Sequence, residues 1–128
     1  MRAAIDAEFG TDFDPCPAMD NGDLREKDGL SSWHGRVFCN PPYGRLLPRW
    51  IAHGLSELQK GHCALIVWLI PARTDTKCFH EMLLPHASEI RFLRGRIHFE
   101  MKGKARVRAP FPSMLVIMRR DPPVGGKP

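Results

Sequence analysis

The chain has 128 residues, of which 43% are hydrophobic and 26% are charged. These values fit one soluble globular domain and leave little room for a second domain. The longest apolar run, Ala64 to Ile70, is far shorter than the ~20 residues of a membrane-spanning helix. Acidic residues near the start argue against a secretory signal peptide, so we expect a cytoplasmic protein. The formal net charge of +5 favours an anionic partner.

The N-terminal part of the sequence predicts one short helix and two strands. A helical turn is expected over Ala3–Phe9, and a brief strand over Asp12–Asp14 that Pro15 stops. Residues 16–32 are rich in Asp, Gly and Asn, which is typical of a loop. The run Arg36–Cys39 predicts a short buried strand, which two prolines end soon afterwards.

The middle of the sequence predicts a helix, a buried strand and a second helix. Pro48 suits the first turn of a helix, and apolar residues recur after it at helical spacing until Gly61 stops the helix. The nearly continuous apolar run Ala64–Ile70 is typical of a strand that is covered on both faces. Thr74 or Asp75 is expected to cap the second helix.

The C-terminal part predicts two strands around a charged connector. Apolar and polar residues alternate over Glu89–Phe99, which predicts a strand, and Met114–Met118 predicts the last one. The charged stretch Glu100–Arg108 between them is expected to be a hairpin tip. Residues 1–120 are therefore expected to form a single domain, and the Pro- and Gly-rich residues 121–128 a disordered tail.

This order of elements predicts a mostly parallel α/β sheet with an antiparallel closing pair. In such a sheet, ligands bind beyond the carboxyl ends of the strands. Three of the predicted strands end at loops marked by proline, at Pro15, Pro41 and Pro71. We expect these three loops to share one rim of the sheet and to hold the functional site.

The run Asn40-Pro41-Pro42-Tyr43 is the strongest functional signal in the sequence. A buried strand brings Asn40 to the rim, and the two prolines fix the backbone and remove two N–H donors. The side-chain oxygen of Asn40 and the carbonyl oxygen of Pro41 are left as acceptors, and Tyr43 supplies an aromatic face. The alternative is a proline-rich turn in which Tyr43 only caps the core.

This set of groups suits the methylation of an aromatic amine, which is a poor nucleophile because its lone pair is delocalised into the ring. Two acceptors that hold the two amine hydrogens free the lone pair, through positioning and electrostatics. Tyr43 stacks on a base swung out of the double helix, an interaction worth about 1–3 kcal/mol. The expected catalytic residues are therefore Asn40, Pro41, Pro42 and Tyr43.

Further motifs accompany this run in a fixed order. They are Phe13-Asp14-Pro15-Cys16, Asp28-Gly29-Leu30 with Trp33, the Asn-Pro-Pro-Tyr-Gly run itself, Trp50-Ile51, the run from Leu69 to Thr76, Phe79-His80, the run from Ile90 to Phe99, and Pro112-Ser113. Over residues 6 to 118 the series resembles the phage-type (Dam-like) DNA N6-adenine methyltransferases. The resemblance implies a three-layer α/β fold of the S-adenosylmethionine-dependent methyltransferase type, with a Rossmann-like mixed sheet.

The resemblance also implies the cofactor S-adenosylmethionine. Asp14 matches the acid that contacts the methionine part of the cofactor in these enzymes. Asp28 matches the acid that binds the adenine amino group, with Leu30 beside the ring, and Asp20 is the candidate for the ribose hydroxyls. The alternative is that Asp20 and Asp28 are ordinary loop residues that favour turns. The cofactor-binding residues are thus expected to be Asp14, Pro15, Cys16, Asp20, Asp28, Leu30 and Asn40.

The sequence departs from the family pattern at its start. Members usually begin with a Trp-x-Thr-Pro segment that helps to cover the cofactor, and this chain starts after that point. We therefore expect an N-terminally shortened fold and weak cofactor binding. Two other functions stay open: a non-catalytic DNA-binding remnant of such an enzyme, and an amino-methyltransferase that acts on RNA or on protein glutamine.

Basic residues are dense in the C-terminal third, with Phe92, Phe99 and Phe111 between them. We expect the phenylalanines to lie in the core and the basic side chains to contact the phosphates of double-stranded DNA near a flipped adenine. The alternative is a solvated hairpin. The recognition sequence, the oligomeric state and the biological role in a bacterial host or phage stay open. The expected DNA-binding residues are Arg73, Arg94, Arg96, Lys102, Lys104, Arg106 and Arg108.

The four cysteines form no Cys-x-x-Cys pair. Two of them, Cys39 and Cys63, lie in apolar runs that predict strands. We expect free, buried thiols in a reducing compartment rather than a metal site.

Overall fold

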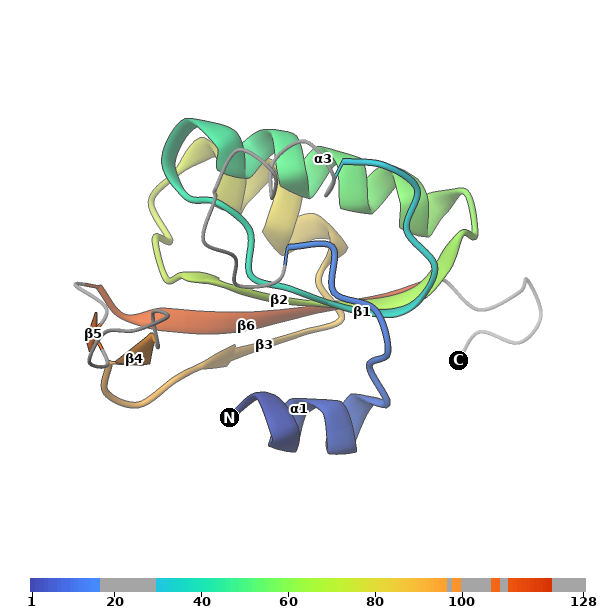
Figure 1. Cartoon of the computed structure of the whole chain (residues 1–128). Coiled ribbons are helices and arrows are strands. Elements are labelled where there is room, and N and C mark those ends of the chain that lie inside the picture. Colours follow the sequence, from blue (N-terminus) through green and yellow to red (C-terminus); the bar gives the residue numbers. More distant parts are fainter. Residues whose placement is uncertain (17–29, 97, 100–106, 109–110, 121–128) are drawn as a thin grey trace.

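The computed structural model describes residues 1–16, 30–96, 98–99, 107–108 and 111–120 (Figure 1). The predicted helices over Ala3–Phe9 and from Pro48, and the predicted strands over Arg36–Cys39, Ala64–Ile70 and Met114–Met118, are all confirmed within a residue or two. The elements are, in chain order, α1 (Arg2–Phe9), β1 (Gly35–Cys39), a 3-10 turn (Gly44–Leu46), α3 (Leu47–Gln59), β2 (Cys63–Pro71), a π-helical turn (Phe79–Leu83), a second 3-10 turn (Leu84–His86), β3 (Glu89–Phe92), β4 (His98–Phe99), β5 (Val107–Arg108) and β6 (Ser113–Arg119).

The main sheet is mixed, with the strand order β1-β2-β6-β3. Strands β1 and β2 are parallel, and β6 runs antiparallel to both of its neighbours, β2 and β3. On the outer side of β1, Phe13 forms an isolated parallel bridge with Val37. The strand predicted over Asp12–Asp14 is therefore reduced to one bridge, because Pro15 cannot donate a ladder hydrogen bond. The predicted antiparallel closing pair is confirmed by β3 and β6. The prediction that the sheet is mostly parallel was wrong, because β6 lies between β2 and β3 and pairs antiparallel with both.

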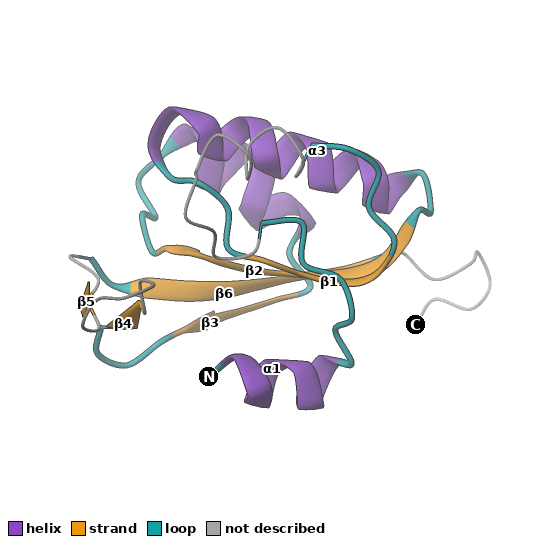
Figure 2. Cartoon of the chain, in the orientation of Figure 1, coloured by secondary structure: helices purple, strands orange, loops and turns teal. Residues whose placement is uncertain are grey.

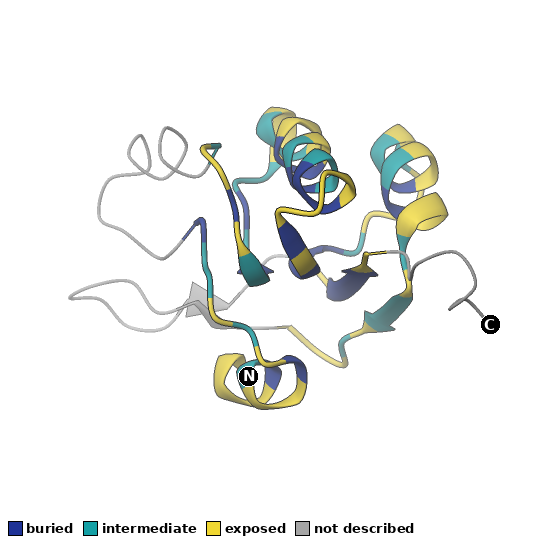
Figure 3. Ribbon diagram, turned by 90° about the vertical axis from the view of Figure 1, so that its right-hand side faces the viewer, coloured by how far each residue is buried: buried dark blue, intermediate teal, exposed yellow. Residues whose placement is uncertain are grey.

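Helices cover the two faces of the sheet, which gives three layers (Figure 2). On one face, α3 and the π-helical turn bury Trp50, Ile51 and Phe79 against the sheet. On the other face, α1 buries Ile5 and Phe9. Strand β2 serves both cores because successive side chains point to opposite faces. Strands β2 and β6 are largely buried and β3 only partly buried, whereas α1 and α3 are buried only on their inner sides (Figure 3).

Gly54 lets α3 lie close to the sheet. A Cβ atom at this position would lie 2.6 Å from ring atoms of both Trp33 and Trp68, closer than real carbon atoms approach. The two indole rings lie 5.6 Å apart at their centroids, and both side chains are fully buried. Glycine therefore sets the distance between helix and strand at this point, at the cost of some helix propensity.

The cap of the second helical segment is Thr76, so the prediction of Thr74 or Asp75 was wrong. The Thr76 hydroxyl accepts a hydrogen bond of 3.1 Å from the backbone N–H of Phe79, and it donates one to the carbonyl oxygen of Arg73. Thr74 and Asp75 occupy an exposed turn before this cap. The helical segment that follows is short and irregular, and it buries Phe79 and Leu83.

The strand predicted over Glu89–Phe99 is interrupted. Strand β3 ends at Phe92, and a bend follows in which Gly95 has the left-handed φ of 74°. Phe92 is 63% exposed, so the prediction that it lies in the core was wrong. Strand β3 is an edge strand of the sheet, and Phe92 is its last residue. The side chain of Phe99 lies outside what the structure describes.

A second, two-stranded sheet forms the expected hairpin. His98 pairs with Arg108 and Phe99 pairs with Val107 in antiparallel register. The predicted tip thus ends earlier than Arg108, because Val107 and Arg108 belong to β5. Residues 100–106 and the predicted tail, residues 121–128, lie outside the described residues. Among the described helices, none is long and apolar enough to cross a membrane.

Candidate functional site

Four loops meet at one edge of the main sheet, on the left in Figure 1. Strands β1, β2 and β3 end at this edge and β6 begins there, as the pairing of Pro71 with Ser113 shows. The backbone N–H of Ala72 donates to the carbonyl of Pro112 at 2.9 Å, and that of Leu93 donates to the carbonyl of Ser113 at 3.0 Å. The prediction of a shared rim is confirmed, and we call it the carboxyl edge.

The run Asn40-Pro41-Pro42-Tyr43 leaves β1 at this carboxyl edge. Pro41 is buried, whereas Asn40 and Tyr43 are half-buried. The Tyr43 hydroxyl donates a hydrogen bond of 2.7 Å to Oδ1 of Asn40. Gly44 follows with a φ of 76°, a conformation that other residues rarely adopt, and starts the 3-10 turn into α3. The turn thus holds the Asn40 oxygen and the Tyr43 ring together at the edge.

Phe111 and Arg73 stand next to Tyr43. The rings of Tyr43 and Phe111 lie edge to face, with centroids 5.2 Å apart and an angle of 81°. The Arg73 guanidinium lies 5.5 Å from the centroid of the Phe111 ring. Sequence reasoning assigned Phe111 to the core and missed its place here. The sequence does contain one indication of this place. Phe111 lies just before the last strand, and that strand begins at the carboxyl edge.

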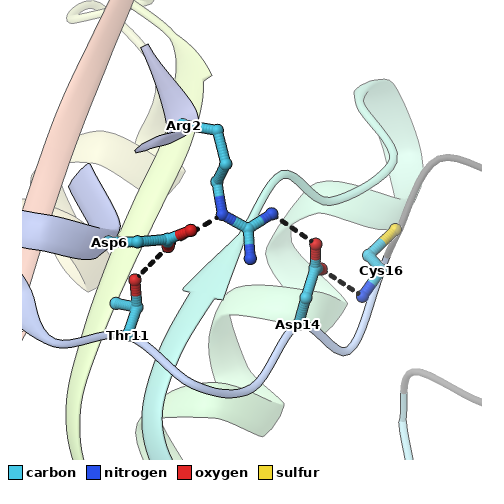
Figure 4. A network of polar contacts seen from close by, with 5 residues as sticks. All are labelled: Arg2, Asp6, Thr11, Asp14 and Cys16. Carbon is cyan, nitrogen blue, oxygen red and sulfur yellow. Dashed lines mark hydrogen bonds and ion pairs between the residues drawn. The ribbon is translucent and has the colours of Figure 1, made fainter. Parts of the chain in front are cut away.

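Asp14 lies at the same carboxyl edge, after the Phe13 bridge, and Figure 4 shows its contacts. Oδ1 of Asp14 accepts a hydrogen bond of 3.0 Å from the backbone N–H of Cys16, and Oδ2 lies 2.8 Å from Nη1 of Arg2. Pro15 and Cys16 are buried. Sequence reasoning did not name Arg2, because nothing in the pattern of the first residues indicates that α1 reaches Asp14.

Arg2 is itself held in place on several sides. Its Nε donates to Oδ1 of Asp6 at 2.9 Å, and its guanidinium lies 4.2 Å from the centroid of the Phe38 ring. Asp6 also accepts a hydrogen bond from the Thr11 hydroxyl (Figure 4). Burial lowers the pKa of Arg2, but the bonds to Asp6 and Asp14 outweigh it and leave the pKa above its ordinary value. The cation is therefore permanent.

Glu57 holds the chain where it enters β1. This carboxylate on α3 is 5% exposed, and its Oε1 accepts the backbone N–H of Trp33 at 2.8 Å. The Ser32 hydroxyl and Nδ1 of His62 lie 3.4 Å and 3.1 Å from the same oxygen. Burial raises the pKa of Glu57, but the bonds from Trp33 and His62 lower it to a net value below the ordinary one. Leu30, a predicted cofactor residue just upstream, is half-buried against the core on the α3 face.

The remaining predicted site residues divide into three groups. Arg73, Arg94 and Arg96 are exposed in the loops that follow β2 and β3, at the carboxyl edge. Arg108 belongs to β5, and its side chain is not among the parts that the structure describes. The predicted residues outside the described ranges are Asp20, Asp28, Lys102, Lys104 and Arg106.

The cysteines and carboxylates give no metal site in the part of the chain that the structure describes, where no three metal-ligating side chains converge. Cys16, Cys39 and Cys63 are buried, Cys78 is half-buried, and none of these four cysteines forms a disulfide. Burial raises the pKa of Cys63 to about 11, and the nearby Glu57 adds to the rise. Cys63 is thus an unreactive core residue.

The described residues thus form an α/β fold with the Asn-Pro-Pro-Tyr motif beyond the carboxyl end of a parallel strand, which is where ligands bind in such sheets. The family model described as DNA N-6-adenine-methyltransferase (Dam) matches residues 1–125. The chain therefore belongs to the Dam family of S-adenosylmethionine-dependent, adenine-specific DNA methyltransferases, whose fold is Rossmann-like. A search of the curated proteins finds no match.

The described residues fit the cofactor that this family uses. Asp14 is a half-buried carboxylate at the carboxyl edge, and a carboxylate is a strong acceptor for an ammonium group. Asn40 follows the adjacent strand at the same edge, and half-buried Leu30 offers an apolar surface on the α3 side. Asp14, Asn40 and Leu30 are among the described side chains that would border S-adenosylmethionine.

Proposed function

We propose that this protein transfers a methyl group from S-adenosylmethionine to the N6 amine of an adenine flipped out of DNA. The observation that carries the proposal is the hydrogen bond of 2.7 Å from the Tyr43 hydroxyl to Oδ1 of Asn40. It shows an amide oxygen that accepts a donor at the carboxyl edge, beside an aromatic ring. A flipped adenine requires both groups: an acceptor for a hydrogen of its amine and an aromatic face on which its ring can stack.

The chemistry of the site follows from its acceptors. An adenine N6–H takes the place of the Tyr43 hydroxyl on Oδ1 of Asn40, and the Pro41 carbonyl holds the second hydrogen. Neither Pro41 nor Pro42 has an N–H that would compete for these positions. The held amine presents its lone pair for attack, and its proton leaves to solvent afterwards. The cofactor supplies an electrophilic methyl group on a sulfonium.

Cofactor binding is proposed for the residues that the family resemblance marks. Asp14, Pro15 and Cys16 hold the methionine end, and Asn40 borders it. Asp28 and Leu30 hold the adenine, and Asp20 the ribose hydroxyls. Support for the first set comes from Asp14, whose carboxylate lies at the carboxyl edge and is oriented by the Cys16 N–H.

The DNA path is proposed to run over the carboxyl edge and the hairpin. Arg73 is exposed beside the Phe111 ring that contacts Tyr43, so a positive charge lies close to the proposed base pocket. Arg94 and Arg96 are exposed in the bend that leads to β4. Basic side chains near the flipped base neutralise phosphates and fix the register of the duplex. The proposed hairpin contacts are Lys102, Lys104, Arg106 and Arg108.

One experiment separates this proposal from its alternatives. The protein is incubated with isotope-labelled S-adenosylmethionine and, in parallel, with double-stranded DNA, RNA and a glutamine-containing protein mixture. We expect label in DNA alone, recovered as N6-methyladenine. DNA binding without transfer would indicate a non-catalytic remnant, and label in RNA or protein would give the site a different substrate. We also propose that residues 1–120 act as one domain.

A further inference from the structure

Arg2 places a positive charge beside the proposed cofactor site. It lies in the first turn of α1, whose N-terminal end points to the carboxyl edge in Figure 1. Its guanidinium stacks on Phe38, near the end of β1, and contacts Asp14, which follows the neighbouring bridge. The cation therefore lies between the two chain segments that end at the proposed methyl-transfer site.

The guanidinium is oriented before any ligand arrives. Nε is used by Asp6 and Nη1 by Asp14, and the ring of Phe38 covers one of its faces. In Figure 4, Nη2 makes no contact with the other residues drawn, so its two N–H donors can meet another acceptor. The side chain is 43% exposed, so a ligand can reach it. A planar, held guanidinium is well suited to a carboxylate.

The charges around Arg2 favour one kind of ligand. Asp6 and Asp14 both lie within 3 Å of the guanidinium, at 2.9 Å and 2.8 Å, so a simple anion would be repelled by two carboxylates. A zwitterion meets no such penalty when its ammonium group faces Asp14 and its carboxylate faces Arg2. An α-amino acid has these two charges on adjacent atoms, and the methionine end of S-adenosylmethionine is such a group.

We propose that Arg2 binds the α-carboxylate of the methionine end of S-adenosylmethionine, while Asp14 accepts from the α-ammonium group and holds Arg2 in position. The inference rests on the proposed function and adds a residue to its cofactor site. Asp14 then has two tasks, and α1 becomes a part of the cofactor site as well as a cover for the sheet.

The test uses calorimetry with three ligands that differ only at the methionine end. S-Adenosylhomocysteine has both charges, decarboxylated S-adenosylhomocysteine has the ammonium without the carboxylate, and 5′-methylthioadenosine has neither. Arg2→Gln should weaken binding of S-adenosylhomocysteine about 10- to 100-fold, as expected for the loss of one charge-assisted contact. Binding of the other two ligands should stay unchanged. Arg2→Lys should fall in between, because an ammonium offers a single point of contact.

Arg119→Gln is the matched control. The Arg119 guanidinium lies 5.8 Å from the centroid of the Phe9 ring on α1, at the edge of the sheet opposite to the carboxyl edge. It should leave all three affinities unchanged, and thermal unfolding should show all variants folded. Equal weakening for the three ligands in Arg2→Gln, or no weakening at all, would overturn the role of Arg2. Wild-type protein that binds none of the ligands would overturn both proposals. An Arg2 effect on S-adenosylhomocysteine, without any DNA methylation, would overturn the proposed function alone.

Discussion

The Tyr43 hydroxyl donates a hydrogen bond to Oδ1 of Asn40. In the proposed reaction the same oxygen accepts a hydrogen from the adenine amine. The hydroxyl must therefore leave Oδ1 when adenine enters, and the ring is the part of Tyr43 that the reaction uses. Tyr43→Phe keeps the ring and should keep kcat/KM within about fivefold of wild type, since one neutral hydrogen bond is worth about 1 kcal/mol. Tyr43→Ala removes the stacking face and should lower kcat/KM by about 10- to 100-fold or more.

These two variants separate stacking from hydrogen bonding when methyl transfer to DNA is measured under single-turnover conditions. A large loss in Tyr43→Phe would give the hydroxyl a catalytic role of its own. Full activity in Tyr43→Ala would remove the stacking role from the site.

The buried carboxylate of Glu57 is expected to contribute to the stability of the fold. Its pKa in the folded protein is below the ordinary value of 4.5, so it stabilises the fold above pH 4.5, and this contribution is lost as the pH falls through the folded pKa. In Glu57→Gln the free energy of unfolding should be lower at pH 7, and the loss of stability on acidification should be smaller than in wild type. Urea titrations across the acid range measure both.

Glu81 provides the matched comparison, because it is an exposed glutamate on the neighbouring helical turn. Glu81→Gln should keep the wild-type pH dependence. An unaltered acid profile in Glu57→Gln would mean that the contacts with Trp33 and His62 do not stabilise the carboxylate form.

At the scale of elements, the contact of α3 with the sheet depends on Gly54. Replacing glycine by alanine inside a helix ordinarily stabilises it, by up to about 1 kcal/mol. Here the new Cβ would lie 2.6 Å from the rings of Trp33 and Trp68, so the sign should reverse. We expect Gly54→Ala to lower the free energy of unfolding by about 1–3 kcal/mol, the usual range for overpacking.

Thermal or urea unfolding measures this change, with Gln59→Ala as the comparison on an exposed position of the same helix. Gln59→Ala should be close to neutral. A Gly54→Ala variant as stable as wild type would show that α3 can move away from the sheet without loss.

Elements with strong local signals could be predicted from the sequence. The apolar run of β2 and the proline that ends it mark one strand end, and the order of elements then brings Pro15, Pro41 and Pro71 to one edge. The position of Asn40 and Tyr43 at this edge could be predicted because they follow directly after a predicted buried strand. The interruption at Gly95 could not be predicted, because apolar and polar residues alternate on both sides of it. The cap at Thr76 could not be predicted either, because Thr74 and Asp75 are equally suitable residue types. The contact of Arg2 with Asp14 depends on how α1 packs across the sheet, which local pattern does not encode.

At the scale of the whole molecule, the carboxyl edge should be the face that meets DNA. Arg94→Gln with Arg96→Gln should weaken duplex binding on any sequence, because phosphates carry no sequence information. The slope of log affinity against log salt should also flatten by about two units, at roughly 0.9 per lost contact. Fluorescence anisotropy over a salt series measures affinity and slope together.

Arg120 is exposed at the opposite edge of the sheet, after β6, and Arg120→Gln is the matched control. It should change neither affinity nor slope. If the control variant weakened binding as much as the double variant, the DNA would not be confined to the carboxyl edge, and overall charge would account for the affinity.

The most direct test of the central claim is the formation of N6-methyladenine in DNA by Asn40→Ala. The variant removes the acceptor oxygen at the carboxyl edge, whereas Gln59→Ala removes a carboxamide from the far end of α3. Mass spectrometry of digested DNA should show N6-methyladenine with wild type and Gln59→Ala, and a loss of at least about 100-fold with Asn40→Ala, in line with the loss of a group that stabilises a transition state. Near-normal N6-methyladenine from folded Asn40→Ala would contradict the proposed mechanism.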